Sequence, residues 1–215
     1  MNVIVRPYAL VDRPAIRQIC ADTADKGGPV EHIFPDREVF ADLVTRYYTD
    51  FEPGSLWVAA LDGQVVGYLT GCLDSRRYLW IMFWRIFPHA CLRALFRGVF
   101  LHKRTHRFIH AIFKSCMLGG LKRNISFDQY PAHLHVDIKK DFRQMGLGRR
   151  LMENFFTQAK SKGINGIYLT TLEDNFRACR FFEQSGFFVL GRYPVVVPAP
   201  GEFQINHSVL YVKRL

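Results

Sequence analysis

Three titratable side chains alternate along one short, mostly apolar stretch of the chain: His133, His135 and Asp137. The run from His133 to Ile138 is typical of a β-strand, and the strand period of two places these three side chains on one face. A carboxylate beside imidazoles suits proton transfer near neutral pH. The competing interpretation is that each group makes a structural hydrogen bond beneath the segment that precedes the strand. The sequence leaves both interpretations open.

A glycine-containing turn follows this strand and leads into a helix. The turn and the start of the helix comprise Arg143, Gln144, Met145, Gly146, Leu147, Gly148, Arg149 and Arg150. Glycines let backbone N–H groups approach a ligand, and a helix N-terminus adds unpaired donors and partial positive charge. The arginines add full charges, so the turn suits a pyrophosphate cradle, and by itself the pattern also fits an ordinary tight turn. It is not a Walker A loop, because no Gly-Lys-Ser/Thr follows it.

A second informative segment runs from Glu173 to Phe187, after a strand-like run over residues 166–171. Asn175 is a good helix N-cap, and Gly186 is able to end the helix in a left-handed conformation. One helical face carries Ala178, Phe181, Phe182 and Ser185. By itself this pattern predicts only an amphipathic helix with clear boundaries.

Together the two segments resemble the Gcn5-related N-acetyltransferase (GNAT) family. The family's phosphate loop, Arg/Gln-x-x-Gly-x-Gly/Ala, is matched by Arg143, Gly146 and Gly148. Its later segment, Asn-x-x-Ala-x-x-x-Tyr-x-x-x-Gly-Phe, is matched by Asn175, Ala178, Gly186 and Phe187, with Phe182 at the tyrosine position. The resemblance covers residues 1–73 and 128–215.

The resemblance implies an α/β fold with a mixed, mostly antiparallel sheet, splayed between its fourth and fifth strands and flanked by helices. Acetyl-CoA, as acetyl donor, would lie in the resulting V, and no metal is expected. Backbone groups of Val136 and Ile138 would hold the pantetheine arm, and residues 143–149 the pyrophosphate. Asn175, Ala178 and Phe182 would line the opposite wall.

The implied reaction is direct attack of a primary amine, from a small molecule or peptide, on the acetyl thioester. The candidate catalytic residues are Asp137, His135 and His133, with Tyr130 as a hydroxyl that would substitute for the tyrosine replaced by Phe182. The alternative function is a non-catalytic acyl-CoA-binding module whose basic insertion docks a partner.

A narrower resemblance rests on three short sequence motifs. Residues 130–137, together with residues 50–53 and the pair Leu73-Asp74, are similar to the acetyltransferase-like domain attached to O-GlcNAc hydrolases and its bacterial relatives.

The net charge of +10 comes from one segment. Residues 75–127 contain eleven Lys/Arg and no Asp or Glu, and the remainder is nearly balanced. We read residues 74–127 as a basic, aromatic-rich insertion of two or three helices between strands three and four, with Pro88 as an interruption. No run there is long enough to span a membrane. Three roles stay open: a helical cap, a pocket lid that selects an anionic acceptor, or membrane-surface contact over 78–100; nucleic-acid binding is not expected.

The whole chain, residues 1–215, is interpreted as one acetyltransferase domain. Expected strands lie near residues 2–8, 56–61, 64–73, 133–138, 166–171, 187–197 and 204–213. Expected helices lie near 12–24, 37–48, 147–162 and 175–185, with Asp12 and Asp36 as the caps of the first two. A proline-rich break is expected over Pro194–Gly201. Five widely spaced cysteines and an N-terminus without a signal-peptide pattern predict a reduced, cytoplasmic protein. Exposed apolar area on 78–100 would favour a homodimer.

Overall fold

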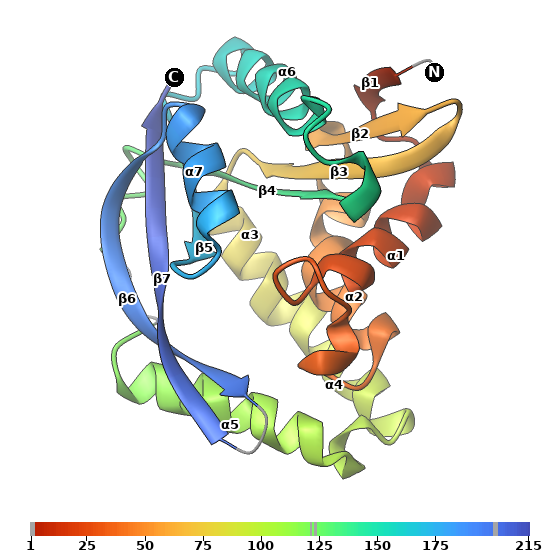
Figure 1. The fold of residues 1–215 in the computed structure, drawn as a ribbon, viewed down its shortest axis with the longest axis vertical. Helices are drawn as coiled ribbons and strands as arrows, with labels where there is room; N and C mark the ends of the chain where they lie inside the picture. The colour runs from red at the N-terminus through yellow and green to blue at the C-terminus, as the bar shows by residue number, and fades with distance from the viewer. Residues whose placement is uncertain (1–2, 121, 123, 200–201) are drawn as a thin grey trace.

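A single seven-stranded sheet organises the protein in the computed structural model, which describes residues 3–120, 122, 124–199 and 202–215 (Figure 1). The strands are β1 (Val3–Pro7), β2 (Leu56–Leu61), β3 (Gln64–Cys72), β4 (Ala132–Ile138), β5 (Gly166–Leu172), β6 (Phe188–Ala199) and β7 (Glu202–Arg214). Their spatial order is β1-β2-β3-β4-β5-β7-β6. Every neighbouring pair is antiparallel except β4–β5, which is parallel. The predicted mixed, mostly antiparallel sheet is therefore confirmed.

The sheet splays between β4 and β5. These strands are paired only near their starts, where Ala132 lies opposite Ile167 and His133 opposite Tyr168. Both strands continue for several residues beyond those pairs. The V between β4 and β5 that the sequence predicted is thus present, and its open end lies where β4 leads into the glycine-containing turn (Figure 1).

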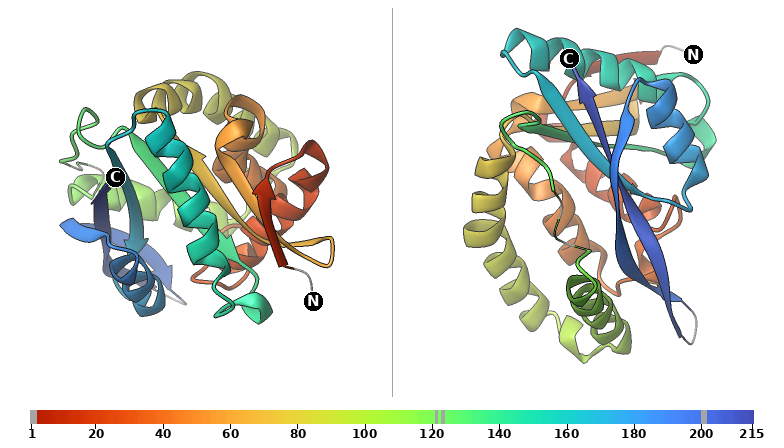
Figure 2. Two further views of the ribbon diagram at one scale, coloured as in Figure 1. Left: turned by 90° about the horizontal axis from the view of Figure 1, so that it is seen from above. Right: turned by 90° about the vertical axis from the view of Figure 1, so that its left-hand side faces the viewer.

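Helices cover both faces of the sheet (Figure 2). On one face, α6 (Leu147–Ser161) and α7 (Phe176–Gln184) share a core with the inner strands, centred on Leu151 and Phe155. On the other face lie α1 (Arg13–Thr23) and α2 (Arg37–Arg46), which pack over β2 and β3. The shorter helical turns are η1 (Leu10–Asp12), η2 (Val30–His32), η3 (Tyr47–Phe51), η4 (Pro53–Ser55) and η7 (Lys140–Phe142).

Side-chain caps fix the starts of two helices as the sequence predicted, at Asp36 and Asn175. Asp36 accepts a hydrogen bond from the Val39 backbone N–H at 2.9 Å and caps α2. Asp12 differs, because its carboxylate binds Arg6 and the Ala9 N–H instead of capping α1. The first helix is therefore held by a contact back to β1.

The insertion between β3 and β4 is helical: α3 (Ser75–Ile81), η5 (Met82–Ile86), α4 (Phe87–Phe96), η6 (Val99–Leu101) and α5 (Lys103–Met117). The first three join into one curved rod, so the expected interruption at Pro88 is wrong (Figure 2). Pro88 falls in the first turn of α4, directly after the wider π-helical turn of η5. A missing N–H costs little there, because first-turn N–H groups need no partner within their own helix.

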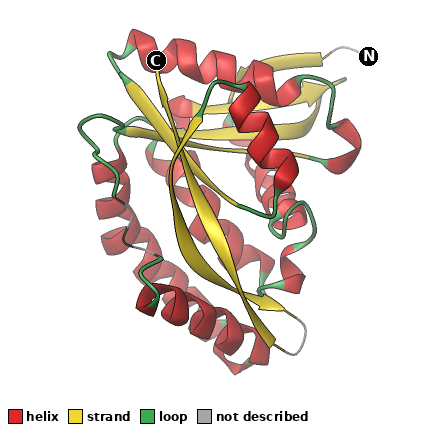
Figure 3. Ribbon diagram, turned by 60° about the vertical axis from the view of Figure 1, so that its left-hand side comes forward, coloured by secondary structure: helices red, strands yellow, loops and turns green. Residues whose placement is uncertain are grey.

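The proline-rich break is also wrong as far as the structure describes it, since β6 runs unbroken through Pro194 to Ala199; residues 200–201 lie outside the described part. β6 is an edge strand, where only one side must pair, and proline is tolerated there. Its outer side is covered by α5, where the Ser115 hydroxyl accepts from the Val196 N–H at 2.8 Å. Figure 3 shows the long β6–β7 hairpin reaching α5.

No helix among the described residues is long and apolar enough to cross a membrane.

Candidate active site

The turn after β4 has the backbone shape of an anion cradle. Gln144 and Gly146 adopt left-handed φ angles of 65° and 72°, and Gly146 is the N-cap of α6. No side chain caps this helix start, so its first N–H groups remain available to a ligand. Leu147 and Gly148 are buried beneath the turn, whereas Met145 is exposed. The predicted cradle therefore divides into an exposed rim and a packed base.

Two guanidinium groups approach each other beside this turn. Burial and the charge of Arg177, at the start of α7, lower the pKa of Arg143. Arg143 Nε donates to the Ile138 carbonyl at 3.0 Å, which turns the side chain back along β4. Arg149 is largely exposed and pairs with Glu153 at 2.9 Å. An anion between Arg143 and Arg177 would relieve their repulsion, which fits a pyrophosphate group.

The free edge of β4 supplies the second requirement for acetyl-CoA. Over residues 134–138 this strand pairs with β3 on one side, while its pairing with β5 has already ended. Val136 and Ile138 lie within that open edge. Backbone N–H and C=O groups there are able to pair with the amides of an extended pantetheine arm, as with an added strand. The residues present thus fit the cofactor that the sequence predicts.

The opposite wall of the V comes from α7. The Asn175 side chain caps α7 by accepting from the Ala178 N–H at 3.3 Å, so its carbonyl oxygen is already engaged. Phe181 lies against Gly148, where a Cβ added to the glycine would approach the ring to 2.9 Å. Phe182 is buried among Phe187 and other core aromatics. Phe182 therefore serves the core and offers no hydroxyl to the V.

The α1–α2 connection crosses the mouth of the V. Lys26 forms an ion pair with Asp174, in the turn between β5 and α7. The neighbouring Gly27, with φ 94°, lies so close to Arg143 that a Cβ would approach its guanidinium to 2.7 Å. Together these contacts join the α1–α2 connection to both arms of the V.

Asp137 and His135 form a hydrogen-bonded pair at this end of β4. His135 Nε2 lies 3.0 Å from Asp137 Oδ2, and the Tyr68 hydroxyl donates to the same oxygen at 2.7 Å. Burial opposes ionisation of Asp137, but His135, Tyr68 and Thr23 outweigh it and hold the pKa of that carboxyl below its ordinary value. The Asp137 charge in turn raises the pKa of His135, against the effect of burial. The pair is chemically able to accept a proton, and its imidazole is 52% accessible.

His133 lies in a different environment on the same face of β4. Its ring is buried, with Nε2 at 2.9 Å from the Tyr48 hydroxyl and Nδ1 at 2.8 Å from the Ser75 hydroxyl. Burial, helped by the charge of His135, lowers the pKa of His133 to about 3. A ring held neutral with both nitrogens occupied is suited to joining β4 to η3 and α3.

Tyr130 lies apart from the other candidates. It precedes β4 at the end where β4 and β5 are paired, and it is buried against Gly166 at the start of β5. Seven residues of extended chain separate it from Asp137, roughly 20 Å. The four candidate catalytic residues are therefore divided into one close pair and two separate sites.

Tyr68 and Thr23 are the site residues that the sequence reasoning missed. Tyr68 lies directly opposite Asp137 in the β3–β4 register, and Thr23 ends α1. Aligning the two strands as an antiparallel pair would have identified Tyr68. Nothing in the local sequence around Thr23 points to Asp137, because that contact depends on how α1 packs on the sheet.

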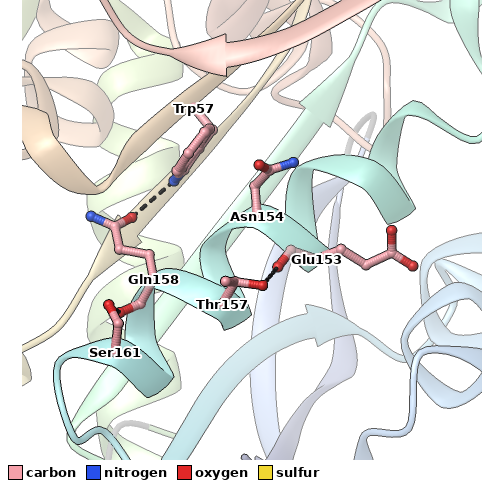
Figure 4. A pocket seen from close by; sticks show the side chains of 6 residues that line it. All are labelled: Trp57, Glu153, Asn154, Thr157, Gln158 and Ser161. Carbon is pink, nitrogen blue, oxygen red and sulfur yellow. Dashed lines mark hydrogen bonds between the residues drawn. The ribbon is translucent and has the colours of Figure 1, made fainter.

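A shallow hollow between Trp57 of β2 and the second half of α6 is a poor candidate for a ligand site (Figure 4). Trp57 Nε1 donates to Gln158 Oε1 at 2.9 Å, and Gln158 in turn donates to the Gly54 carbonyl. The hydroxyl of Thr157 is bonded to the Glu153 carbonyl. These polar side chains of the hollow are thus already hydrogen-bonded within the protein. Across the described part of the chain, no cluster of His, Cys, Asp and Glu has the make-up of a metal site.

Comparison with known proteins agrees with this geometry. The acetyltransferase (GNAT) family matches residues 30–187. The solved structure of SsHAT superimposes with a TM-score of 0.72 and 25% sequence identity, covering 100% of this chain and 98% of that one. yncA, a putative acetyltransferase from Salmonella typhimurium solved with its cofactor acetyl-CoA, gives a TM-score of 0.59 at 15% identity, covering 100% and 95%. A ribosomal-protein-alanine N-acetyltransferase from Brucella melitensis gives 0.58 at 16% identity, covering 99% of each chain.

The family match covers most of the chain, and the splayed sheet and the glycine-containing turn before α6 are both in place. The chain belongs to the GNAT acetyltransferase family. It is an N-acetyltransferase, and its acetyl donor is acetyl-CoA.

Proposed function

We propose that the acceptor is a primary amine, carried by a small molecule or a peptide, which attacks the acetyl thioester directly. The observation that carries this proposal is the Asp137–His135 pair, braced by Tyr68, at the splay between β4 and β5. A protonated amine has no lone pair, so the reaction requires a nearby proton acceptor. The half-exposed imidazole of His135 is accessible to solvent and to the acetyl-accepting amine. The carboxylate of Asp137 raises the pKa of that imidazole.

The proposed step balances without a further reagent. The neutral amine nitrogen forms a bond to the carbonyl carbon, and its proton passes to His135, directly or through water. The carbon–sulfur bond breaks, and the sulfur leaves as a thiolate, which is a good leaving group because a thiol pKa is about 8.5. A backbone N–H on the open edge of β4 would stabilise the oxyanion. We assign no direct part to His133 or Tyr130, given their burial and distance from the pair.

The cofactor contacts follow the same reasoning. We propose that Val136 and Ile138 pair with pantetheine and that the turn with residues 143–149 holds the pyrophosphate. Support comes from the left-handed residues of the turn, the uncapped start of α6 and the closely placed charges of Arg143 and Arg177. Ala178 and Phe182 would act through the packing of α7 rather than by polar contact.

Acceptor-dependent CoA release over a panel of primary amines tests the function, with CoA affinity measured separately by calorimetry. We expect Asp137→Asn to lower kcat by about 10²–10⁴, typical of lost acid–base catalysis, with CoA affinity unchanged. Asp128→Asn, at an exposed ion pair with Arg76, is the matched control and should leave both unchanged. Tight CoA binding with no amine-dependent release from any panel member would instead support the non-catalytic binding module.

We further propose that residues 1–215 form one domain interrupted by 74–127, since strands before and after the insertion share one sheet. A cytoplasmic location is supported by five unpaired cysteines. The narrower resemblance to O-GlcNAc hydrolase-attached domains stays a prediction. Two of its motifs, residues 50–53 and Leu73-Asp74, are in contact, because Glu52 Oε1 accepts a hydrogen bond from the Leu73 N–H at 2.8 Å. The side chain of Asp74 then caps α3.

A further inference from the structure

Exposed apolar side chains are concentrated on the helical insertion. Of the 23 large hydrophobic side chains exposed among the described residues, 15 belong to residues 79–118. Four aromatic rings lie at positions i, i+3, i+4 and i+7 along the rod formed by α3, η5 and α4: Trp80, Phe83, Trp84 and Phe87. Their exposed fractions are 57%, 63%, 64% and 55%. This spacing puts them on one side of the rod, and we call this surface the aromatic face.

The other side of the same rod packs against the protein. Ile81, Ile86, Ala90 and Ala94 are buried, and α4 is fastened to α2 by Arg93 with Asp42 at 2.5 Å and by Arg97 with Asp36. Figure 2 shows the rod at the edge of the molecule, with α2 on its inner side. The aromatic face is therefore not an unpacked core, because the rod already has a complete buried side.

Charge decides what kind of surface covers the aromatic face. Arg77 and Arg85 are exposed on the rod, and residues 75–127 contain no Asp or Glu, so Asp74 at the start of the insertion is its one acidic residue in the sequence. A symmetric homodimer would place this patch against itself, so arginine would meet arginine with no carboxylate from residues 75–127 to compensate. An anionic surface removes that difficulty, and aromatic rings between arginines are the composition of helices that lie in a membrane interface.

We propose that the aromatic face binds the surface of a bilayer containing anionic phospholipid. The rod would lie along the interface, with the rings of Trp80 and Trp84 inserted at the boundary between headgroups and acyl chains and Arg77 and Arg85 against lipid phosphates. The protein would rest on the membrane without crossing it, since no helix among the described residues is both long and apolar enough to span a bilayer. The active site is built on β4, which is not part of the rod, so this binding is independent of the proposed acceptor chemistry.

Vesicle flotation with the full chain tests the proposal, comparing phosphatidylcholine vesicles with vesicles that also contain phosphatidylglycerol. We expect binding only to the anionic vesicles, weakening as NaCl rises from about 0.1 to 0.5 M. Vesicles whose acyl chains carry bromine should quench tryptophan emission, because two of the three tryptophans lie on the aromatic face. Quenching requires insertion of the rings into the acyl region.

Two variants and two matched controls locate the surface. Trp84→Ser should weaken vesicle partitioning about tenfold through lost apolar burial, and Arg85→Glu by at least about fivefold through lost phosphate attraction. Leu10→Ser, at a side chain 72% exposed, and Lys160→Glu, on the exposed side of α6, should partition like the unaltered protein. Because all four positions are exposed, the four variants should keep their melting temperature.

Three results would overturn the proposal. One is failure of the unaltered protein to float with anionic vesicles at about 0.1 M salt. Another is flotation that Trp84→Ser and Arg85→Glu leave unchanged. The third is a dimer in analytical ultracentrifugation, or binding of a fluorescent oligonucleotide, that Trp84→Ser abolishes in a protein that binds no vesicle. That result would assign the aromatic face to a second copy or to nucleic acid.

Discussion

His133 should make this protein acid-labile, because the folded state holds its imidazole neutral. Burial lowers its pKa to about 3, and the nearest polar groups are the hydroxyls of Tyr48 and Ser75, with His135 two positions away on the same face. In the unfolded chain the same ring has a pKa of about 6.5. As the pH falls below that value, the unfolded state binds a proton that the folded state does not. Stability is therefore full above about pH 7 and is lost as the pH falls toward 3.

The size of the loss follows from the two pKa values. Each pH unit below the unfolded pKa costs about 1.36 kcal/mol, so this one ring should remove about 1.4 kcal/mol between pH 8 and 5.5. At pH 4.5 the loss reaches about 2.7 kcal/mol, a sizeable part of a typical folding free energy. His135 remains present in the unaltered protein and in a His133 variant, so its opposite contribution largely cancels in the comparison.

The assay is urea unfolding of the unaltered protein and of His133→Gln at pH 8 and 5.5. The variant will be less stable at both pH values, because it leaves one buried hydroxyl without its hydrogen-bond partner. That loss costs about 1–3 kcal/mol of unfolding free energy. The informative quantity is the loss of unfolding free energy between pH 8 and pH 5.5. This loss should be about 1.4 kcal/mol smaller in the variant than in the unaltered protein. His89→Gln, at an exposed position on α4, is the control and should keep the full pH dependence. If His133→Gln loses as much stability as the unaltered protein, His133 is not held neutral.

Three further predictions concern the site and its supports. Asp137→Asn should move the acid limb of the kcat/KM profile to lower pH, because the carboxylate that raises the pKa of His135 is gone while the burial that lowers it remains; an unmoved limb in initial-rate pH profiles would refute the pairing. Glu52→Ala should lower the unfolding free energy by about 2–4 kcal/mol in urea titrations, since it leaves the buried partners of a carboxylate unpaired, whereas the exposed Glu153→Ala should change it by less than about 0.5; equal effects would count against a structural role for Glu52. Gly146→Ala should lower Tm by about 2–4 °C through left-handed strain and weaken CoA binding in calorimetry; full CoA affinity would remove the turn from the pyrophosphate site.

Local sequence signals predicted the parts of the fold that depend on neighbouring residues. The turn around Gly146 and the caps Asp36 and Asn175 occur where the sequence put them, because a cap or a left-handed glycine acts within one helical turn. The prolines were misread for the opposite reason. Pro194 is tolerated because β6 is an edge strand, which depends on the order of strands in the sheet.

The candidate site shows the same division. The residues of the glycine-containing turn, 143–149, are contiguous in the sequence, so the chain itself keeps them together. Tyr68 and Thr23 reach Asp137 from a neighbouring strand and from a helix, and no period within either element predicts that contact. The α1–α2 connection reaches Arg143 and Asp174 only because α1 packs on the sheet over β2 and β3.

By itself, the sequence predicted the acetyl donor, through the resemblance of two segments to the GNAT family. Strand, turn and helix follow one another without a gap, and the resulting donors and charges suit a pyrophosphate whatever surrounds them. It also determined that His133, His135 and Asp137 share a face, since strand alternation is a local property. Only the tertiary structure decided what covers that face. α3 and η3 enclose His133 and keep it neutral, while beyond the last β4–β5 pair the sheet opens and leaves His135 beside Asp137, partly in solvent. Side chains of one type, two residues apart, differ because burial and partners come from segments distant in the chain.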